Sequence, residues 1–477
     1  MDGKLAQTIK PDADQPLAEY GLIDLWIEFS QTTGLHAVDK IKPISCRPFS
    51  IRGLLWSLVL CSTTGFLVYN LVEEIGTYYS YPTVTKITPQ IKHSIKFPAV
   101  TICNRCTFNN TRLDVYPEME NYFFNISRGK TRKDSFSHLT SDVFQKPVSL
   151  EWLKNMSMEG SKMLFKCVFG GDIFKCMTDF QPIFTYEGLC HTFNFNASKS
   201  VFMAGDDANL IVTFNINQND YTYINNMAAG IKVFLHHPDV HPDASSTVVT
   251  AAPGSSTYVA IQKIQYRYQT HPYMAFDDTA CLDTNSLDFV NPLKFYSRYS
   301  YDHCFMECVQ LKAFKQCGCV GPYVPVASRR CSLVQLHTCY NPAVRSLSKN
   351  GTFAKECRCL SECVFDRYTA QVSSSSFPAD KWESSLLNET GAKNRESMID
   401  NFLELKVFYD QMMVTSVTQL PQYTAASLFS SVGGQMGLCL GASILTVAEI
   451  AELLVFVLVF LFDKCRGRKA RNRISNW

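Results

Sequence analysis

The sequence predicts an α+β membrane protein with two transmembrane helices and a large, disulfide-rich, mixed ectodomain between them. Two long apolar stretches, one near each end of the 477-residue chain, predict the two spans. Fifteen of the 19 cysteines, Cys103 to Cys363, lie between these stretches. Cysteine concentrated in one continuous region indicates that this region folds in an oxidising compartment.

The first apolar stretch, residues 53–72, has 20 residues without a charge, which is the length of one spanning helix. Lysines and arginines precede it and two glutamates follow it, so the positive-inside rule places residues 1–52 in the cytoplasm. A buried helix of a soluble domain is the alternative, but it does not account for these flanks. A cleaved signal peptide is not expected, because the stretch begins too far into the chain. Residues 22–29 are apolar enough for a short amphipathic helix.

The second apolar stretch, residues 423–462, carries full charges only at Glu449 and Glu452. As one straight helix it would reach about 60 Å, whereas about 20 residues suffice to cross a bilayer. The small residues Gly441-Ala442-Ser443 lie where a break would be tolerated, although such a string also suits a helix-packing face. Because carboxylates inside apolar sequence mark a water-filled path, the stretch predicts a pore.

The basic tail, residues 463–477, is also predicted to be cytoplasmic, which leaves residues 73–422 outside the cell. The positions of the Asn-x-Ser/Thr glycosylation signals agree with this topology, because all of them fall in the predicted ectodomain. These asparagines are Asn109, Asn125, Asn155, Asn196, Asn350 and Asn388.

The ectodomain sequence mixes strand-like and helical patterns. Alternating or β-branched apolar runs predict strands at residues 95–102, 210–216, 230–235, 256–266 and 403–414. Helical, more polar stretches are predicted at residues 149–165, 299–314 and 379–402, and residues 373–376 are expected to form a serine-rich loop.

Ten of the cysteines lie between Cys281 and Cys363. Cys304 and Cys308 are four apart and would share one face of a helix, from which a ladder of bridges could run to a second segment. Zinc is the competing interpretation, but the block lacks paired Cys-x-x-Cys motifs and lies outside the cell, so no metal site is predicted. The spacing alone does not fix the pairing.

Composition excludes several functional classes. The net charge is +2 and no basic domain or zinc-finger spacing is present, so no nucleic-acid partner is expected. The chain has no Gly-x-Ser-x-Gly, His-Glu-x-x-His or phosphate-binding loop, so neither an enzyme nor a cofactor is predicted.

Three features together resemble the degenerin, epithelial sodium channel and acid-sensing ion channel family. They are Phe97-Pro98-Ala99-Val100-Thr101-Ile102-Cys103-Asn104 after the first span, the ten-cysteine block, and Gly433-Gly434-Gln435-Met436-Gly437 leading to Gly441-Ala442-Ser443. The resemblance implies a plasma-membrane, sodium-selective channel blocked by amiloride, with three identical or related subunits. It also implies a hand-like subunit with palm, finger, thumb, knuckle and β-ball regions.

The resemblance implies seven disulfides and leaves Cys106 as the one ectodomain cysteine without a partner. The implied pairs are Cys103–Cys190, Cys167–Cys176, Cys281–Cys363, Cys304–Cys359, Cys308–Cys357, Cys317–Cys339 and Cys319–Cys331.

The resemblance also assigns roles in the pore. Gly441-Ala442-Ser443 matches the selectivity filter, and three copies of Glu449 and of Glu452, which share a helix face, would form two acidic rings. The gate region matches Ser430, Ser431, Gly433 and Gly434, where Ser431 replaces the aspartate of acid-sensing channels. His36 matches the histidine of an N-terminal His-Gly gating motif, in which Ala37 replaces the glycine.

The residues that acid-sensing members use to detect protons are largely missing. Tyr81-Pro82-Thr83 and Thr88-Pro89 stand where those members carry histidines and acids, residues 324–330 contain no acid, and Asn225-Asn226 replaces an acidic pair. We therefore predict opening by an extracellular neuropeptide, with proton gating as the alternative. A two-span surface receptor that does not conduct is a more distant alternative.

Overall fold

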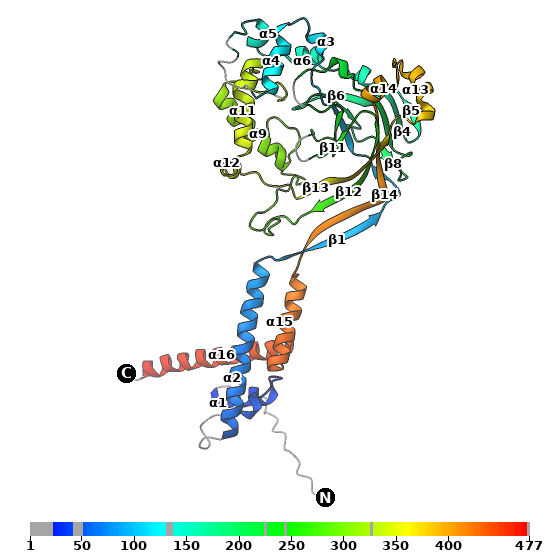
Figure 1. Cartoon of the computed structure of the whole chain (residues 1–477). Coiled ribbons are helices and arrows are strands. Elements are labelled where there is room, and N and C mark those ends of the chain that lie inside the picture. The colour runs from blue at the N-terminus through cyan, green and yellow to red at the C-terminus, as the bar shows by residue number, and fades with distance from the viewer. Residues whose placement is uncertain are drawn as a thin grey trace. The chain divides into compact units, whose positions relative to one another are not determined.

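The computed structural model describes residues 22–41, 51–129, 136, 138–223, 227–242, 246–324 and 328–474. They form two units (Figure 1), one made of the described residues up to Thr83 and from Pro421 onward, the other of Val84–Leu420. The predicted α+β class, with apolar helices toward both ends and a disulfide-rich mixed region between them, is confirmed.

The first unit is helical. Its elements are α1 (Leu22–Thr32), the 3-10 helix η2 (Val38–Lys40), α2 (Ile51–Tyr79), α15 (Ala425–Leu440) and α16 (Ile444–Ile474). α2 and the segment Ile444–Phe462 are long and apolar enough to cross a membrane, with mean hydropathies of 1.6 and 2.6. α15 packs against α2, and α1 contacts α16.

Both predicted spans differ in detail from the helices that form. α2 continues to Tyr79, beyond the predicted end at residue 72, because Glu73 and Glu74 are good helix formers and charge alone does not end a helix. The second predicted span is divided into α15 and α16 by residues Gly441 to Ser443, which are not helical. The predicted break is therefore present.

The second unit is built on two antiparallel or mixed sheets. The larger has the strand order β13-β12-β14-β9-β4-β5, with β1 paired to β14, and the smaller has the order β11-β10-β3-β7-β6. The strands of the larger sheet are β1 (Thr83–Ile91), β4 (Leu164–Phe169), β5 (Asp172–Phe174), β9 (Leu210–Asn215), β12 (Ser255–Arg267), β13 (Val364–Ser376) and β14 (Phe402–Pro421). Those of the smaller sheet are β3 (Ala99–Asn104), β6 (Phe180–Thr185), β7 (Gly188–Phe193), β10 (Ile231–His236) and β11 (Thr247–Ala251). A separate pair joins β2 (Ile95–Lys96) to β8 (Ser200–Val201).

The main core lies between these sheets and explains why all five predicted strand regions form. Phe97, Phe193, Phe214 and Tyr409 are buried in one apolar cluster, in which the ring of Phe97 packs edge-on against Phe193 and Tyr409. Strands whose apolar residues face this cluster remove apolar surface from water, which stabilises the fold by about 25 cal/mol per Å² buried.

Two helical regions flank the sheets. One contains α3 (Asn110–Leu113), α4 (Glu118–Ser127), α5 (Asp142–Gln145), α6 (Leu150–Met156) and α7 (Gly160–Met163). Two further short helices of this unit are α8 (Cys176–Asp179) and η5 (Gln218–Asp220). The other contains α9 (Tyr301–Cys317), α10 (Leu333–Gln335), η6 (Leu336–Tyr340), α11 (Asn341–Ser348) and α12 (Gly351–Glu356). The segment before β14 forms η7 (Asp380–Trp382), α13 (Glu383–Thr390) and α14 (Arg395–Asn401).

Seven disulfides cross-link the second unit, with the pairing that the resemblance implies. Cys304 and Cys308 lie one turn apart on α9 and bond to Cys359 and Cys357, so the expected ladder is present. A bridge that closes a loop of this kind is worth about 2–4 kcal/mol. The ladder therefore ties α9 firmly to the chain that leads into β13.

Two sequence predictions were wrong or incomplete. Residues 373–376, expected as a loop, are the end of β13, where Ser373 to Ser376 pair in register with Tyr258 to Ser255 of β12. Backbone hydrogen bonds hold this exposed edge strand, so its side chains need no apolar pattern. The stretch 149–165 is only partly helical, because α6 and α7 are short and β4 begins at Leu164.

Candidate functional site

The break after α15 is built around Gly441. This glycine has φ 69°, in the left-handed region, and its N–H donates to the Gly437 carbonyl at 2.9 Å. The N–H of Ala442 donates to the Met436 carbonyl at 3.2 Å, which satisfies a second carbonyl of the helix end. Ser443 directly precedes α16, and its N–H donates to Thr446 Oγ1 in the first turn of that helix at 3.1 Å.

The segment from Thr33 to Ala37 lies against this break. The N–H of His36 donates to the Leu440 carbonyl at 2.9 Å. A Cβ placed on Gly441 would come within 2.4 Å of the His36 ring, so only glycine leaves room for the imidazole. The structure thus brings together two predicted sites, His36 with Ala37 and Gly441 with Ala442 and Ser443, that are about 400 residues apart in sequence.

Ala37 forms the turn of this segment although it is not glycine. Its φ is 71°, in the left-handed region, and it precedes the 3-10 helix η2. An L-residue in this region costs roughly 1–2 kcal/mol. Ala37 adopts this conformation while the neighbouring His36 contacts the helix break. The turn therefore forms although alanine replaces the glycine of the His-Gly motif.

Glu449 and Glu452 both lie on α16, just beyond the break. The N–H of Gly34 donates to Glu449 Oε2 at 3.2 Å, and the Glu449 side chain is half-buried. Glu452 is exposed. The two glutamates therefore differ: one contacts the N-terminal segment, and the other presents its carboxylate to the surroundings of the single chain.

The predicted gate residues lie on α15. Ser431 Oγ donates to Glu74 Oε1 of α2 at 2.6 Å, which joins the two helices. Ser430 is exposed, and nothing lies within 4 Å of a Cβ built on Gly433 or Gly434. A carboxylate is thus present beside position 431, but it is supplied by α2 and not by α15.

A family model described as amiloride-sensitive sodium channel matches residues 29–453, which include the helix break, the N-terminal segment from His36 and the whole cysteine block. The chain belongs to this family. It is a family of ion channels found in the plasma membrane, which agrees with the prediction that the chain is not an enzyme.

Several curated relatives of this channel are named acid-sensing ion channels. Acid-sensing ion channel 2 of Homo sapiens is 27% identical over 453 residues, covering 89% of this chain and 85% of the relative. Acid-sensing ion channel 1A of Danio rerio is 27% identical and covers 92% of this chain and 90% of the relative. Acid-sensing ion channel 1 of Gallus gallus is 27% identical, with 93% and 86% covered.

Among solved structures, a proton-activated chloride channel determined by cryo-EM aligns with a TM-score of 0.33 and 8% identity, over 86% of this chain and 97% of that chain. A similarity of this size supports no argument.

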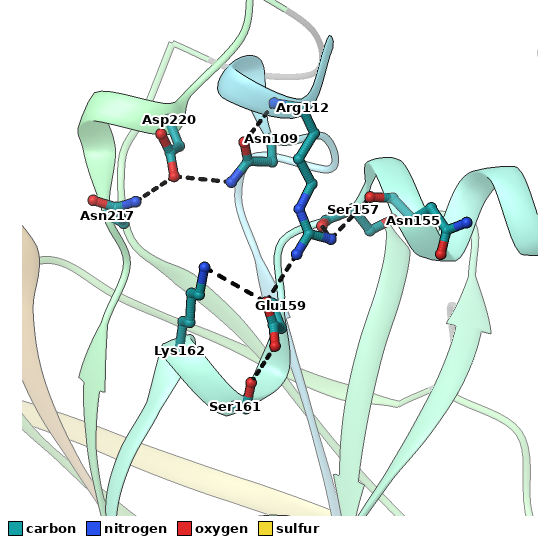
Figure 2. Close-up of polar contacts among 9 residues, drawn as sticks. All are labelled: Asn109, Arg112, Asn155, Ser157, Glu159, Ser161, Lys162, Asn217 and Asp220. Carbon is teal, nitrogen blue, oxygen red and sulfur yellow. Dashed lines mark hydrogen bonds and ion pairs between the residues drawn. The ribbon is translucent and has the colours of Figure 1, made fainter.

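The predicted glycosylation sites of the channel differ in exposure. Asn155, Asn196, Asn350 and Asn388 are exposed, whereas Asn109 and Asn125 are half-buried. Figure 2 shows why Asn109 stands apart: its Oδ1 accepts the N–H of Arg112 and caps α3, and its Nδ2 donates to Asp220 Oδ2 at 2.8 Å. Nearby, Arg112 donates to Glu159 and to the Asn155 carbonyl.

We expect Asn109→Asp to destabilise the ectodomain by about 2 kcal/mol. The new carboxylate could still cap α3, but it loses a hydrogen bond to a charged acceptor and faces Asp220 as a like charge. The measurement is the apparent Tm of the purified channel. Asn155→Asp is the matched control, since it also removes a glycosylation signal, and equal Tm values for the two variants would contradict the structural role of Asn109.

The free cysteine that the prediction singled out, Cys106, is buried and unbridged. Its Sγ lies 3.2 Å from the Phe108 carbonyl and 3.4 Å from Thr222 Oγ1. Burial raises the pKa of this thiol. The thiol is therefore inert toward nucleophilic chemistry at neutral pH.

Some of the positions at which this chain lacks the acids of acid-sensing channels are not described by the structure. Asn225-Asn226 and residues 325–327 lie outside the described residues. Among buried histidines, desolvation lowers the pKa of His191 to about 4 and that of His337 to about 4. Burial also lowers the pKa of His237. His191 and His337 are therefore neutral over most of the range in which an ordinary histidine titrates.

His191 predicts how the stability of the ectodomain depends on pH. Its pKa is about 4 when folded and 6.5 in an open environment, so below pH 6.5 the unfolded chain binds the extra proton and stability falls. At pH 5 this one group should cost about 2 kcal/mol relative to pH 7. Thermal unfolding between pH 7 and 5 measures the slope.

Replacing His191 by a side chain that does not titrate tests whether this residue causes the dependence of stability on pH. His191→Asn should lower the Tm at every pH, because it leaves a gap in the core, but should also flatten the fall between pH 7 and 5. His93→Asn, at an exposed side chain, should leave the profile as it is. An unchanged slope in His191→Asn would refute the assignment.

One contact of the candidate pore was not predicted. The Gly34–Glu449 hydrogen bond joins two segments that were not predicted from the sequence to lie together. The only sequence signal was the run Thr32-Thr33-Gly34 before His36, in which glycine allows close backbone approach.

Proposed function

We propose that three copies of this chain, or of this chain and related subunits, form a sodium-selective cation channel of the plasma membrane that amiloride blocks. The observation that carries the proposal is the break at Gly441, Ala442 and Ser443 between two apolar helices, followed by Glu449. A non-helical stretch at membrane depth is tolerated where it lines a water-filled path.

The geometry of the break supports the proposed filter. Gly441 and Ala442 have side chains small enough for three chains to approach closely, and the carbonyls of a non-helical stretch can replace an ion's water. Glu449 and Glu452 would add negative charge on the intracellular side. Both termini are proposed to be cytoplasmic, as the basic flanks of the two spans and the extracellular glycosylation signals indicate.

We propose an extracellular neuropeptide as the stimulus. The lowered pKa values of His191 and His337, each about 4, support this choice, because these two side chains stay neutral in the mildly acidic range. Proton gating is the second candidate. It is favoured by the names of the relatives and by Glu362, whose pKa burial raises above the ordinary value.

Electrical recording from cells that express only this chain separates the two candidates. Under the peptide hypothesis, an acid step gives little current, and a member of a panel of amidated neuropeptides opens an amiloride-sensitive sodium current. A large transient current at pH 5–6 without peptide would instead establish proton gating. No current under either stimulus, with the chain at the cell surface, would favour the non-conducting receptor.

A further inference from the structure

A cavity of about 470 Å³ lies in the second unit, where several parts of the chain meet. They are β10 and the loop after it, the start of β11, the loop after β12 that carries Phe276, the start of α9, the segment Cys359–Glu362, and the first residues of β13. Its size falls within the range of about 300–1,000 Å³ typical of pockets for small organic ligands. None of the predicted pore or gate residues lines it.

Aromatic rings form one wall of this cavity and are held in place from behind. Phe365 stacks on Tyr266 with ring centroids 5.0 Å apart, and Phe276 packs on Tyr268 at 4.5 Å. Tyr266 and Tyr268 stack on each other in turn, at 6.2 Å. The faces of Phe276 and Phe365 that line the cavity therefore belong to a rigid group of four rings.

Glu362 supplies a carboxylate whose position is fixed by the disulfides around it. It stands between Cys359, bonded to Cys304 of α9, and Cys363, bonded to Cys281. Its Oε2 accepts the N–H of Tyr301 at 3.0 Å, in the first turn of α9. Among the described residues, no lysine or arginine lies within ion-pair distance of this carboxylate.

The charged groups around Glu362 do not neutralise its carboxylate. Burial raises its pKa and the neighbouring Asp302 raises it further, whereas His303 lowers it. Asp302 and Asp366 also line the cavity, and Asp366 is already neutralised by Lys263 at 2.7 Å and lies 3.8 Å from His237 Nε2.

Among the described residues, the two arginines that line the cavity form no ion pair with Glu362. The guanidinium of Arg298 contacts His237 Nδ1 at 3.3 Å, and Arg367 is exposed on β13. His236 is held by Thr101 at 2.7 Å. A carboxylate in a partly apolar pocket beside a second carboxylate is a position that an added positive charge would stabilise.

We propose that this cavity binds a small organic cation, with its ammonium or guanidinium group against Glu362 and an aromatic face against Phe276 and Phe365. The carboxylate supplies a charge-assisted hydrogen bond, and the rigid rings supply stacking and cation–π attraction. Both a free arylalkyl amine and the basic and aromatic side chains of a short peptide carry this chemistry. This site would be one place where the proposed peptide binds. Any effect of the site on current rests on the proposed gating by a peptide, whereas binding itself does not.

Binding to the purified full-length channel tests the proposal without relying on current. The probes are phenethylammonium and its uncharged analogue 2-phenylethanol, followed at pH 7.5 by saturation-transfer NMR, and the dipeptide arginyl-phenylalaninamide distinguishes a peptide source. We expect phenethylammonium to bind wild type and 2-phenylethanol to bind at least tenfold more weakly. Stronger binding of the dipeptide than of the amine would assign the site to peptides, and the reverse would assign it to small amines.

Two variants locate the site. Glu362→Gln keeps an oxygen that can accept the Tyr301 N–H, so it should fold, yet it should weaken phenethylammonium binding roughly 10- to 100-fold. Phe276→Leu should weaken binding severalfold while keeping the wall apolar. Glu356→Gln, an exposed change in the same disulfide-bonded region, is the matched control and should bind as wild type does.

The dependence on pH gives an independent readout. Protonation of Glu362 removes the charge, so binding should weaken as pH falls through its raised pKa, and this dependence should vanish in Glu362→Gln. Equal binding of phenethylammonium to wild type and Glu362→Gln, or no binding to wild type, would overturn the proposal. Neither result would bear on whether peptides open the channel, which the recordings test separately.

Discussion

Replacing Gly441 by alanine should abolish at least nine-tenths of the channel current while leaving the chain at the cell surface. The φ of Gly441 is 69°, where an alanine costs roughly 1–2 kcal/mol. In addition, the new methyl group would lie 2.4 Å from the His36 ring, which is closer than carbon atoms approach without displacement. Whole-cell current divided by surface expression is the measurement.

Two further variants separate the causes of this loss. Gly437→Ala is the matched control, because its Cβ would meet the Ala442 carbonyl at an ordinary 3.8 Å within α15. It should keep most of the current. Combining Gly441→Ala with His36→Ala removes the clash but not the backbone strain, so a partial recovery of current is expected. Wild-type current in Gly441→Ala alone would show that the contact with His36 is absent from the working channel.

The helix break could be predicted from sequence because it follows from chemistry confined to a few neighbouring residues. A 40-residue apolar stretch is too long for one span, and Gly441 is one of the glycines in it whose backbone suits a left-handed helix end. Buried strands such as β9 and β10 were equally visible, because their apolar residues face the core. Local pattern was sufficient in both cases.

Contacts between segments far apart in the sequence could not be predicted from local sequence patterns. The edge strand β13 ends in four serines, and only its pairing with β12 makes it a strand, so composition suggested a loop. The Gly34–Glu449 hydrogen bond and the cavity beside Glu362 likewise depend on which segments meet. The seven disulfide pairs were an intermediate case, because the resemblance to the family implied them whereas cysteine spacing alone left the pairing open.

Glu449 should carry two separable roles, which we expect its variants to divide. Glu449→Gln removes the charge but keeps an oxygen that can accept the N–H of Gly34. The loss of one acidic ring should lower sodium conductance roughly tenfold at low ionic strength, the lower end of the effect of a charged cleft on ion capture. Single-channel conductance over a range of salt concentrations measures this loss, which should shrink as added salt screens the remaining charges.

Glu449→Ala removes the acceptor as well as the charge, so it should add a second defect. Without Glu449 Oε2, the segment that holds His36 beside Gly441 loses one of its contacts with α16, and opening should change in addition to conductance. Glu452→Gln is the matched control for charge alone, because Glu452 is exposed and makes no hydrogen bond or ion pair to any described residue. It should lower conductance without altering opening. Identical gating in Glu449→Ala and Glu449→Gln would mean that the contact with Gly34 does not hold the N-terminal segment in the conducting channel, and Glu449 would then act through its charge alone.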